Sequence, residues 1–434
     1  MKNIDNIIKN DKKYFLSTTR GDYKFVADFG ENEFVFDVNG KKLIDFSSFI
    51  SVYNLGVNGN YQIRKGIKDQ VDKLMHAAFT DYYAELPIEF AAKLLEFMPK
   101  SHGRMFLSNS GTEANEAAIK FSKIFTKRQY TIAFYNGFHG RTHGSLSLTS
   151  SRYIHRQHFG PFPNVVHVPF AYCYRCPFNL EYPGCGLACV DHIRKYPLSK
   201  EVPPKEVASI FFEPIQGEGG YIVPPKDYFK ELKSVADDIG ALIVSDEIQA
   251  GFMRTGKFLA LDNFGIDADI YSMAKAVGGG LPLGVTVVKK SLGDIPSGAH
   301  ASTFGGNLLS VRAGIESLNY VKKNKRALVS GIKKKGNYVM KRLNEMKEVY
   351  SVVGDVRGIG LMIGVELVVD RKTKEPATKQ RNMIIKEAFN RGLLLLPAGE
   401  STIRIIPPLT IHDKSLEHGM NIIEELISKH SAKN

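Results

Sequence analysis

The segment ALIVSDEIQAGFMRTGKFLALDNFGIDADIYSMAKAVGGGLPLGVTVVKK, residues 241–290, contains three short apolar runs. These runs, 241–247, 269–274 and 285–290, are rich in the β-branched residues that favour strands. Runs that are apolar almost throughout indicate strands covered on both faces, as in a mainly parallel sheet. Because ligands of such sheets bind beyond the carboxyl ends of the strands, we expect functional side chains directly after these runs.

Two further runs of the same kind lie upstream, YTIAFY at 130–135 and ASIFFE at 208–213. They alternate with helical patterns from about residue 104 onward, which is an α/β signature. The sequence therefore predicts a large domain over residues 56–320, built on a doubly wound sheet.

The two ends of the chain differ from this central region. After residue 320 come a Lys-rich helical stretch, a helix near 378–391 and a last helix that we expect to begin with Asp413 as N-cap. We expect a smaller α+β domain over 321–434. The stretch FVFDVNGKKLIDFSS, with a turn at Asn39-Gly40, predicts a strand pair, and we place residues 1–55 with the small domain.

Composition excludes several classes of protein. Apolar residues make up 43% and charged residues 24% of the 434, and no run approaches the roughly 18 apolar residues of a membrane span. The first residues lack the apolar core of a secretory signal, so we expect a cytoplasmic location. The net charge of +13 is spread along the chain, and no zinc-finger or RNA-binding motif accompanies it, so we expect no nucleic-acid partner.

All four cysteines fall in one short segment: Cys173, Cys176, Cys185 and Cys189. The pattern C-x2-C-x8-C-x3-C is similar to a small metal-binding knuckle, although the second pair is wider than the usual zinc spacing. Structural zinc, two local disulfides and four plain thiols all remain open, and we assign no metal.

A glycine turn opens a predicted helix at Ser108–Lys120. Ser110 and Glu113 have the spacing of a capping box. The free N–H groups of a helix start, with Gly111 and the hydroxyls of Ser110 and Thr112, suit a phosphate group. An ordinary capped helix would have the same pattern.

Two strand ends carry groups suited to cofactor chemistry. Asp246 ends the run ALIVS, where its carboxylate can hold a proton on a pyridine nitrogen. Lys275 follows the run DIYSMA and precedes a glycine-rich stretch, which favours an amine with a lowered pKa near a cofactor.

Six motifs occur in order along the chain: the helix start at 110, Phe-His-Gly-Arg, Glu-Pro-Ile-Gln-Gly-Glu-Gly-Gly, Ser-Asp-Glu-Ile-Gln-Ala-Gly-Phe, Ala-Lys, and Ser-Thr-Phe-Gly-Gly-Asn. With them the chain resembles class III aminotransferases of fold type I, which depend on pyridoxal 5'-phosphate and include 4-aminobutyrate, ornithine and acetylornithine aminotransferases. The resemblance covers essentially the whole chain.

The resemblance implies cofactor roles. Lys275 would form the Schiff base and shuttle a proton, Asp246 would pair with the ring nitrogen, and Gln249 would bind the phenolic oxygen. Phe138 would stack on the ring, and the phosphate would lie on the turn at 110–112. Thr303 would reach the phosphate of a partner subunit, so sites would be shared within a homodimer or a dimer of dimers.

The resemblance also implies how amino-acid and 2-oxo-acid substrates bind. Arg404 would bind an α-carboxylate, and Glu218 would mask Arg404 when an ω-amino substrate is present. An unpaired buried guanidinium costs roughly 3 to 5 kcal/mol, so such a mask is physically reasonable. Arg141 would take the distal carboxylate of 2-oxoglutarate, and Glu213 would support this region.

The chain departs from the family pattern at Gly56–Tyr61, near the substrate entrance, and at the cysteine insert, residues 172–190. The insert resembles an archaeal-type branch that also contains amino-acid racemases. We therefore expect transfer of an amino group from 4-aminobutyrate or ornithine to 2-oxoglutarate, with a racemase or epimerase as the alternative. A binding or metal-knuckle protein without catalysis is disfavoured because Lys275, Asp246, Gln249 and Arg404 are all present.

Overall fold

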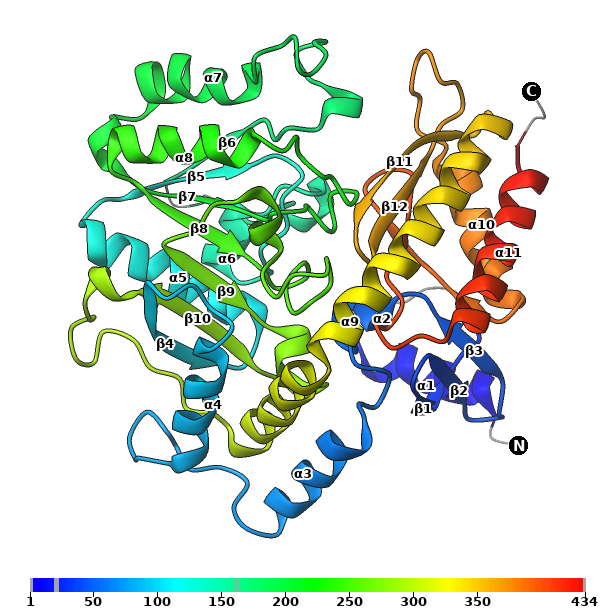
Figure 1. The fold of residues 1–434 in the computed structure, drawn as a ribbon, viewed down its shortest axis with the longest axis horizontal. Helices are drawn as coiled ribbons and strands as arrows, with labels where there is room; N and C mark the ends of the chain where they lie inside the picture. The colour runs from blue at the N-terminus through cyan, green and yellow to red at the C-terminus, as the bar shows by residue number, and fades with distance from the viewer. Residues whose placement is uncertain (1–2, 19–22, 161, 163, 432–434) are drawn as a thin grey trace.

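The computed structural model describes residues 3–18, 23–160, 162 and 164–431. Figure 1 shows two lobes joined by one long helix, α9, with the chain termini both at the smaller lobe.

The larger lobe is built on a seven-stranded sheet. In spatial order its strands are β4 (His102–Ser108), β10 (Gly284–Lys289), β9 (Ile270–Met273), β8 (Leu242–Asp246), β7 (Val207–Phe212), β5 (Tyr130–Phe134) and β6 (Val165–Val168). The five strands from β9 to β6 pair in parallel, whereas β10 is antiparallel to both of its neighbours. The prediction of a mainly parallel sheet is therefore confirmed.

Helices cover both faces of this sheet. Successive side chains of a strand point to opposite faces. Accordingly Phe211 packs in a cluster with Phe121 of α5, while Phe212 packs against Phe229 of α8 with the two rings tilted. The helices of the lobe are α3 (Tyr61–Val71), α4 (Glu85–Leu95), α5 (Gly111–Thr126), α6 (His143–Leu148), α7 (Ala188–Lys195) and α8 (Tyr228–Ile239).

The smaller lobe contains an antiparallel sheet. Its strands are β11 (Val353–Ile359), β12 (Met362–Leu367), β15 (Thr402–Ile405) and β14 (Leu396–Ala398), accompanied by α10 (Thr378–Asn390) and α11 (Asp413–Lys429). The prediction that Asp413 is the N-cap of the last helix is wrong. His412 occupies the cap position, and Asp413 begins the helix with its carboxylate 2.6 Å from the ammonium of Lys334.

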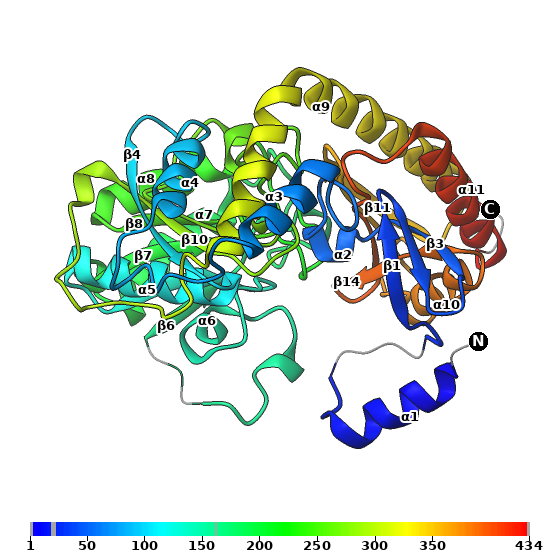
Figure 2. The same cartoon turned by 90° about the horizontal axis from the view of Figure 1, so that it is seen from below.

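Both chain ends form a further sheet. Strands β1 (Ala27–Glu31), β2 (Phe34–Asp37) and β3 (Lys42–Asp45) pair in antiparallel fashion, and β13 (Leu393–Leu394) joins β3 in parallel. A left-handed turn labelled α2 (Ser48–Ser51) follows. Helix α1 (Ile4–Tyr14) buries no residue and lies apart from the rest in Figure 2.

Helix α9 (Leu308–Val349) connects the two lobes over 42 residues. It packs against α3 and α4 towards one of its ends and against β11 and α11 towards the other. Its apolar residues Val321, Leu328 and Ile332 are buried, while Lys322 and Lys333 are exposed. The basic run is therefore a solvated helix face. The domain boundaries expected at residues 55 and 320 stay predictions, and residue 320 lies within this continuous helix.

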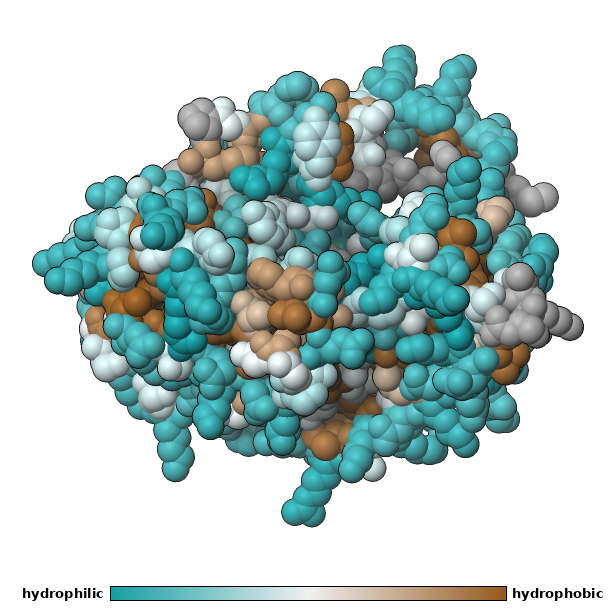
Figure 3. Space-filling model, turned by 90° about the horizontal axis from the view of Figure 1, so that it is seen from above, coloured by the Kyte–Doolittle hydropathy of each residue, from teal (hydrophilic) through white to brown (hydrophobic). Residues whose placement is uncertain are grey.

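Figure 3 shows one face of the molecule, where hydrophilic side chains predominate and hydrophobic residues form small groups. Within the described part of the chain, none of the helices is long and apolar enough to cross a membrane.

The contact between α11 and the N-terminal sheet yields a stability prediction. A Cβ at Gly419 would lie 2.2 Å from Cζ of Phe46, a fully buried ring. Overpacking of this kind costs about 1 to 3 kcal/mol, so Gly419→Ala is expected to lower the free energy of unfolding by that amount in denaturant titrations.

Gly331→Ala is the matched control, because Gly331 also lies in a helix but has nothing within 4 Å of the added Cβ. It is expected to stabilise the protein by about 0.5 to 1 kcal/mol. Equal effects of the two substitutions would contradict this packing.

Candidate active site

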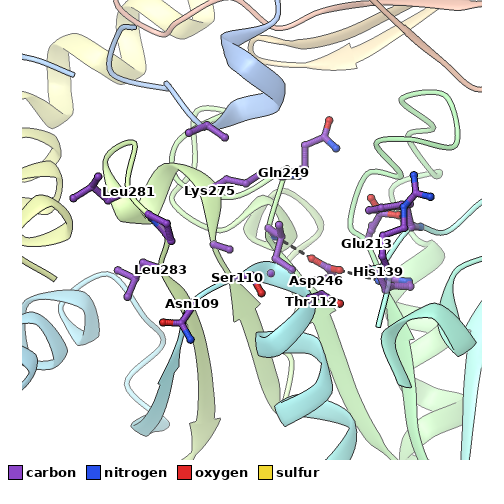
Figure 4. A pocket seen from close by; sticks show the side chains of 18 of the residues that line it. Asn109, Ser110, Thr112, His139, Glu213, Asp246, Gln249, Lys275, Leu281 and Leu283 are labelled. Carbon is purple, nitrogen blue, oxygen red and sulfur yellow. Dashed lines mark hydrogen bonds and ion pairs between the residues drawn. The ribbon is translucent and has the colours of Figure 1, made fainter. Parts of the chain in front are cut away.

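The ends of β8 and β9 and the start of α5 meet around one cavity of about 450 Å³. Figure 4 shows Asp246, Lys275, Gln249 and Thr112 around this cavity, carried by the end of β8 and the loop after it, the turn after β9 and the start of α5. The cavity brings together most of the site residues expected from the sequence: Ser110, Gly111, Thr112, Phe138, Arg141, Glu213, Asp246, Gln249 and Lys275. Glu218, Arg404 and Thr303 lie outside this lining.

Lys275 begins a tight turn directly after β9. Its φ is 53°, in the left-handed region that costs a non-glycine residue roughly 1 kcal/mol or more. The turn directs the side chain into the cavity. Burial lowers the pKa of the Lys275 ammonium, while the carboxylates of Asp246 and Glu213 oppose this shift. The lowered pKa favours the neutral amine, as the sequence predicts.

Asp246 is buried at the end of β8 and held by three donors. Its Oδ2 accepts hydrogen bonds from Asn115 Nδ2 and His139 Nδ1, both at 2.8 Å, and its Oδ1 accepts from the Ile248 N–H at 3.0 Å. Donors of this kind stabilise the ionised form of a carboxylate. Asn115 and His139 were not singled out from the sequence, although His139 lies within the Phe-His-Gly-Arg motif.

The start of α5 is arranged to receive an anion. Ser110 caps the helix by accepting from the Glu113 N–H at 3.3 Å, while Glu113 accepts from the Asn109 N–H at 2.7 Å. The predicted capping box is thus present, with its return bond one residue earlier. The Glu113 N–H is thus bound by the Ser110 side chain, and the Ala114 N–H donates to the Ser110 carbonyl. The N–H groups of Gly111 and Thr112 remain for a ligand.

Gly140 allows the segment 138–141 to lie against α5. Its φ is 144°, and a Cβ there would be 2.2 Å from Oγ1 of Thr112. Only glycine fits this approach, which brings Phe138 and Arg141 to the cavity wall. The Arg141 guanidinium lies 5.4 Å from the centre of the Phe138 ring and is otherwise exposed at the cavity mouth.

Gln249 is oriented by a residue that the sequence did not reveal. The hydroxyl of Tyr221 donates to Gln249 Oε1 at 2.9 Å, deep in the protein. This bond leaves the Gln249 amide N–H₂ for a ligand in the cavity.

Glu213 lies in the cavity wall, where its carboxylate accepts hydrogen bonds from the backbone N–H groups of Phe138 and Gly217, both at 2.9 Å. Burial raises the pKa of Glu213 to about 7, and the negative charge of Asp246 adds to the rise, while His139 opposes it. These contacts fit a supporting residue.

Glu218 and Arg404 form an ion pair, Nη2 to Oε2 at 2.8 Å, between the two lobes. The Arg404 residue is 4% exposed, and its Nε also donates to the Pro397 carbonyl at 2.9 Å. Arg152 approaches the other oxygen of Glu218 at 3.4 Å, a contact that no sequence motif indicated. The charges of Arg404 and Glu218 both act on Lys275, so the pair adjoins the cavity.

Thr303 and the cysteines stand apart from this cavity. Thr303 is exposed and lines a separate hollow with Asn109, His300 and Phe304. The four cysteines are free thiols that line one small cavity together. Among the described residues no group of three or more His, Cys, Asp or Glu side chains is placed to hold a metal ion.

A lysine after one strand, a carboxylate at the end of the neighbouring strand and a helix start for a phosphate define a pyridoxal phosphate-dependent enzyme of fold type I. Residues 17–427 match the family described as "Aminotransferase class-III", so the chain belongs to this family. The family and the PLP-bound neighbour structures make pyridoxal 5'-phosphate its cofactor.

The proteins similar to this chain include both a racemase and aminotransferases. The chain is 38% identical to the leucine/methionine racemase of Thermococcus litoralis, over 98% of this chain and 95% of the racemase. It is 33% identical to a probable 4-aminobutyrate aminotransferase of Bacillus subtilis, over 91% of each. The structure of taurine:2-oxoglutarate aminotransferase from Bifidobacterium kashiwanohense, in complex with PLP and glutamate, matches with a TM-score of 0.91 at 26% identity, over 99% and 98% of the chains.

The surroundings of Lys275 yield a pH prediction. In protein stripped of cofactor, acetylation of Lys275 should rise with pH with a midpoint below 10.5, the ordinary lysine value, because burial disfavours the ammonium form. Labelling across a pH series, quantified on peptides by mass spectrometry, measures this midpoint. A midpoint at or above 10.5 would contradict the buried position of the amine.

Proposed function

We propose that the protein transfers an amino group from an ω-amino acid, such as 4-aminobutyrate or ornithine, to 2-oxoglutarate and forms glutamate. The observation that carries this proposal is the Glu218–Arg404 ion pair at 2.8 Å, which covers a buried guanidinium suited to a substrate carboxylate. The names of the Bacillus subtilis relative and of the taurine:2-oxoglutarate aminotransferase support it.

The residues of the cavity fit pyridoxal phosphate. When bound, this cofactor withdraws electrons from the amine-bearing carbon of the substrate. Lys275, with its lowered pKa, holds the cofactor and then moves a proton at that carbon. Asp246 holds a proton on the ring nitrogen, and Gln249 donates to the phenolic oxygen. The N–H groups of Gly111 and Thr112, with the Ser110 hydroxyl nearby, bind the phosphate.

Phe138 covers one face of the cofactor ring and keeps water from it. Arg141, at the exposed mouth, binds the distal carboxylate of 2-oxoglutarate. The α-carboxylate of 2-oxoglutarate binds Arg404, so the Glu218 side chain has to move away from Arg404. An ω-amino donor has no carboxylate on its amine-bearing carbon, so Glu218 stays on Arg404.

A second candidate is an amino-acid racemase. The leucine/methionine racemase and an alanine/serine racemase from Pyrococcus horikoshii, 34% identical over 97% of this chain, favour it. A racemase binds an α-carboxylate in every cycle and gains nothing from a mask on Arg404. The Glu218 contact is the reason that we rank the transaminase first.

An amino-donor panel separates the two candidates. Purified protein is incubated with 4-aminobutyrate, ornithine, leucine and alanine, with and without 2-oxoglutarate, and scored for glutamate and for the chirality of the ornithine, leucine and alanine. The proposal expects glutamate only with an ω-amino donor and 2-oxoglutarate together. Interconversion of L- and D-amino acids without 2-oxoglutarate, and no glutamate when it is added, would establish the racemase instead.

Arg141→Ala tests the proposed carboxylate site in single-turnover assays of each half reaction. Loss of a charge-assisted, bidentate contact costs on the order of 2 to 4 kcal/mol, so the 2-oxoglutarate half reaction should fall roughly thirty- to a thousandfold. The 4-aminobutyrate half reaction should fall as well, because the single carboxylate of 4-aminobutyrate takes the same position as the distal carboxylate of 2-oxoglutarate. An unchanged 2-oxoglutarate half reaction would remove Arg141 from its proposed role.

We also propose that two subunits share each site, as a homodimer or a dimer of dimers. Thr303 lies outside its own cavity on an exposed surface. Exposed apolar side chains lie on its own segment and on the neighbouring segment 75–82: Met75 at 57%, Tyr82 at 71% and Phe304 at 58%. The segments touch, since Asn307 Nδ2 donates to the Met75 carbonyl at 3.2 Å. Apolar groups gathered in this way favour association.

Mixing of inactive variants tests this arrangement. Heterodimers of Lys275→Ala and Thr303→Ala subunits would contain one intact site if Thr303 acts across the interface, so part of the activity should return. Absence of any recovery, after subunit exchange is proven by mass spectrometry, would assign each site to a single chain.

A further inference from the structure

The carboxylate of Glu218 has two arginine partners. Arg404 Nη2 lies 2.8 Å from Oε2, and Arg152 Nη2 lies 3.4 Å from Oε1. Arg404 comes from β15 of the smaller lobe and has a side chain only 5% exposed. Arg152 comes from the larger lobe, and its side chain is 37% exposed. The Arg404 contact is therefore the principal one in this state, and Arg152 is in position beside it.

Positive charge exceeds negative charge at this place. Arg381 of α10 is 6% exposed, and its pKa is lowered to about 10 by burial and by the charges of Arg152 and Arg404. Three guanidinium nitrogens, Arg152 Nε, Arg381 Nη1 and Arg404 Nη1, are buried without a hydrogen-bond partner among the described residues. Three cations thus surround one carboxylate, and they can accommodate a second anion.

The backbone of Glu218 is tied to the loop at Gly399. The Gly399 N–H donates to the Glu218 carbonyl at 2.8 Å. Arg152 Nη2 also donates to the Gly399 carbonyl at 3.4 Å, which ties Arg152 to the same loop. A carboxylate that leaves Arg404 without a new partner would carry the cost of a partly buried, unpaired charge.

We propose that Arg152 is a specificity-determining residue, which receives the Glu218 carboxylate when a substrate α-carboxylate takes Arg404. The transfer needs a rotation of the Glu218 side chain alone, because Arg152 already contacts its Oε1. Arg152 thereby stabilises the state that accepts dicarboxylates. This inference rests on the proposed function for the identity of the substrate that displaces Glu218.

Glutarate is the probe, because it has the two carboxylates of 2-oxoglutarate but no reacting group. Its binding to the holoenzyme is measured by isothermal titration calorimetry and does not depend on turnover. Arg152→Ala should weaken glutarate binding roughly five- to tenfold, since Glu218 then stays on Arg404. Arg152→Lys keeps a cation and should keep most of the affinity.

Variants that lack the Glu218 carboxylate test whether Arg152 acts through that carboxylate. Glu218→Ala should bind glutarate more tightly, because Arg404 is unmasked. Adding Arg152→Ala to Glu218→Ala should then change the affinity by less than about twofold, as expected for a coupled pair. Arg156→Ala is the matched control, since it removes a charge from the same segment, where Arg156 lies over the Phe162 ring at 4.5 Å.

Three results would overturn this role. They are an unchanged affinity in Arg152→Ala, an equal loss in both backgrounds, and no binding of glutarate to the wild-type holoenzyme. The second result would mean that Arg152 contacts the ligand directly. Failure of the donor panel to yield glutamate is a separate outcome, which concerns the reaction and leaves the glutarate measurement valid.

Discussion

The register of β8 on β9 determines where the chemistry of this protein lies. In this register Asp246 pairs with Ser272, and the strands run parallel, so both strands end at the same edge of the sheet. Lys275 follows two residues after β9 ends. A shift of one residue would turn every side chain of a strand to the opposite face and remove Asp246 from the cavity. The apolar side chains on both faces, packed against α5 and α8, hold this register.

The site then depends on how buried charges are paired. The buried carboxylate of Asp246 accepts hydrogen bonds from Asn115, His139 and a backbone N–H, so its oxygens have partners deep in the protein. Lys275 has its pKa lowered by burial, so it can act as a neutral amine. At the lobe boundary, Arg404 is covered by Glu218. Because an uncovered guanidinium there is costly, the proposed function requires a substrate carboxylate to replace that of Glu218 as the substrate binds.

Much of this arrangement follows from the sequence. Apolar runs predicted β5, β7, β8, β9 and β10 within one or two residues, because strands buried on both faces have a plain signature. The ends of these strands then predicted that Asp246 and Lys275 lie at the ligand-binding edge of the sheet. The sequence could not predict contacts between segments far apart in the chain, such as His139 with Asp246 or Arg152 with Glu218. Strand β13 pairs with β3, some 350 residues away in the chain. The sequence pattern of such a short strand is too weak to predict its partner.

The central claim is that Lys275 holds pyridoxal phosphate covalently at the edge formed by β8 and β9. The most direct measurement is reduction of the cofactor-loaded protein with borohydride, followed by proteolysis and mass spectrometry of every lysine-containing peptide. The account predicts that the reduced cofactor is recovered on the peptide that contains Lys275 and that Lys275→Ala abolishes this label. Recovery of the cofactor on any other lysine would contradict it.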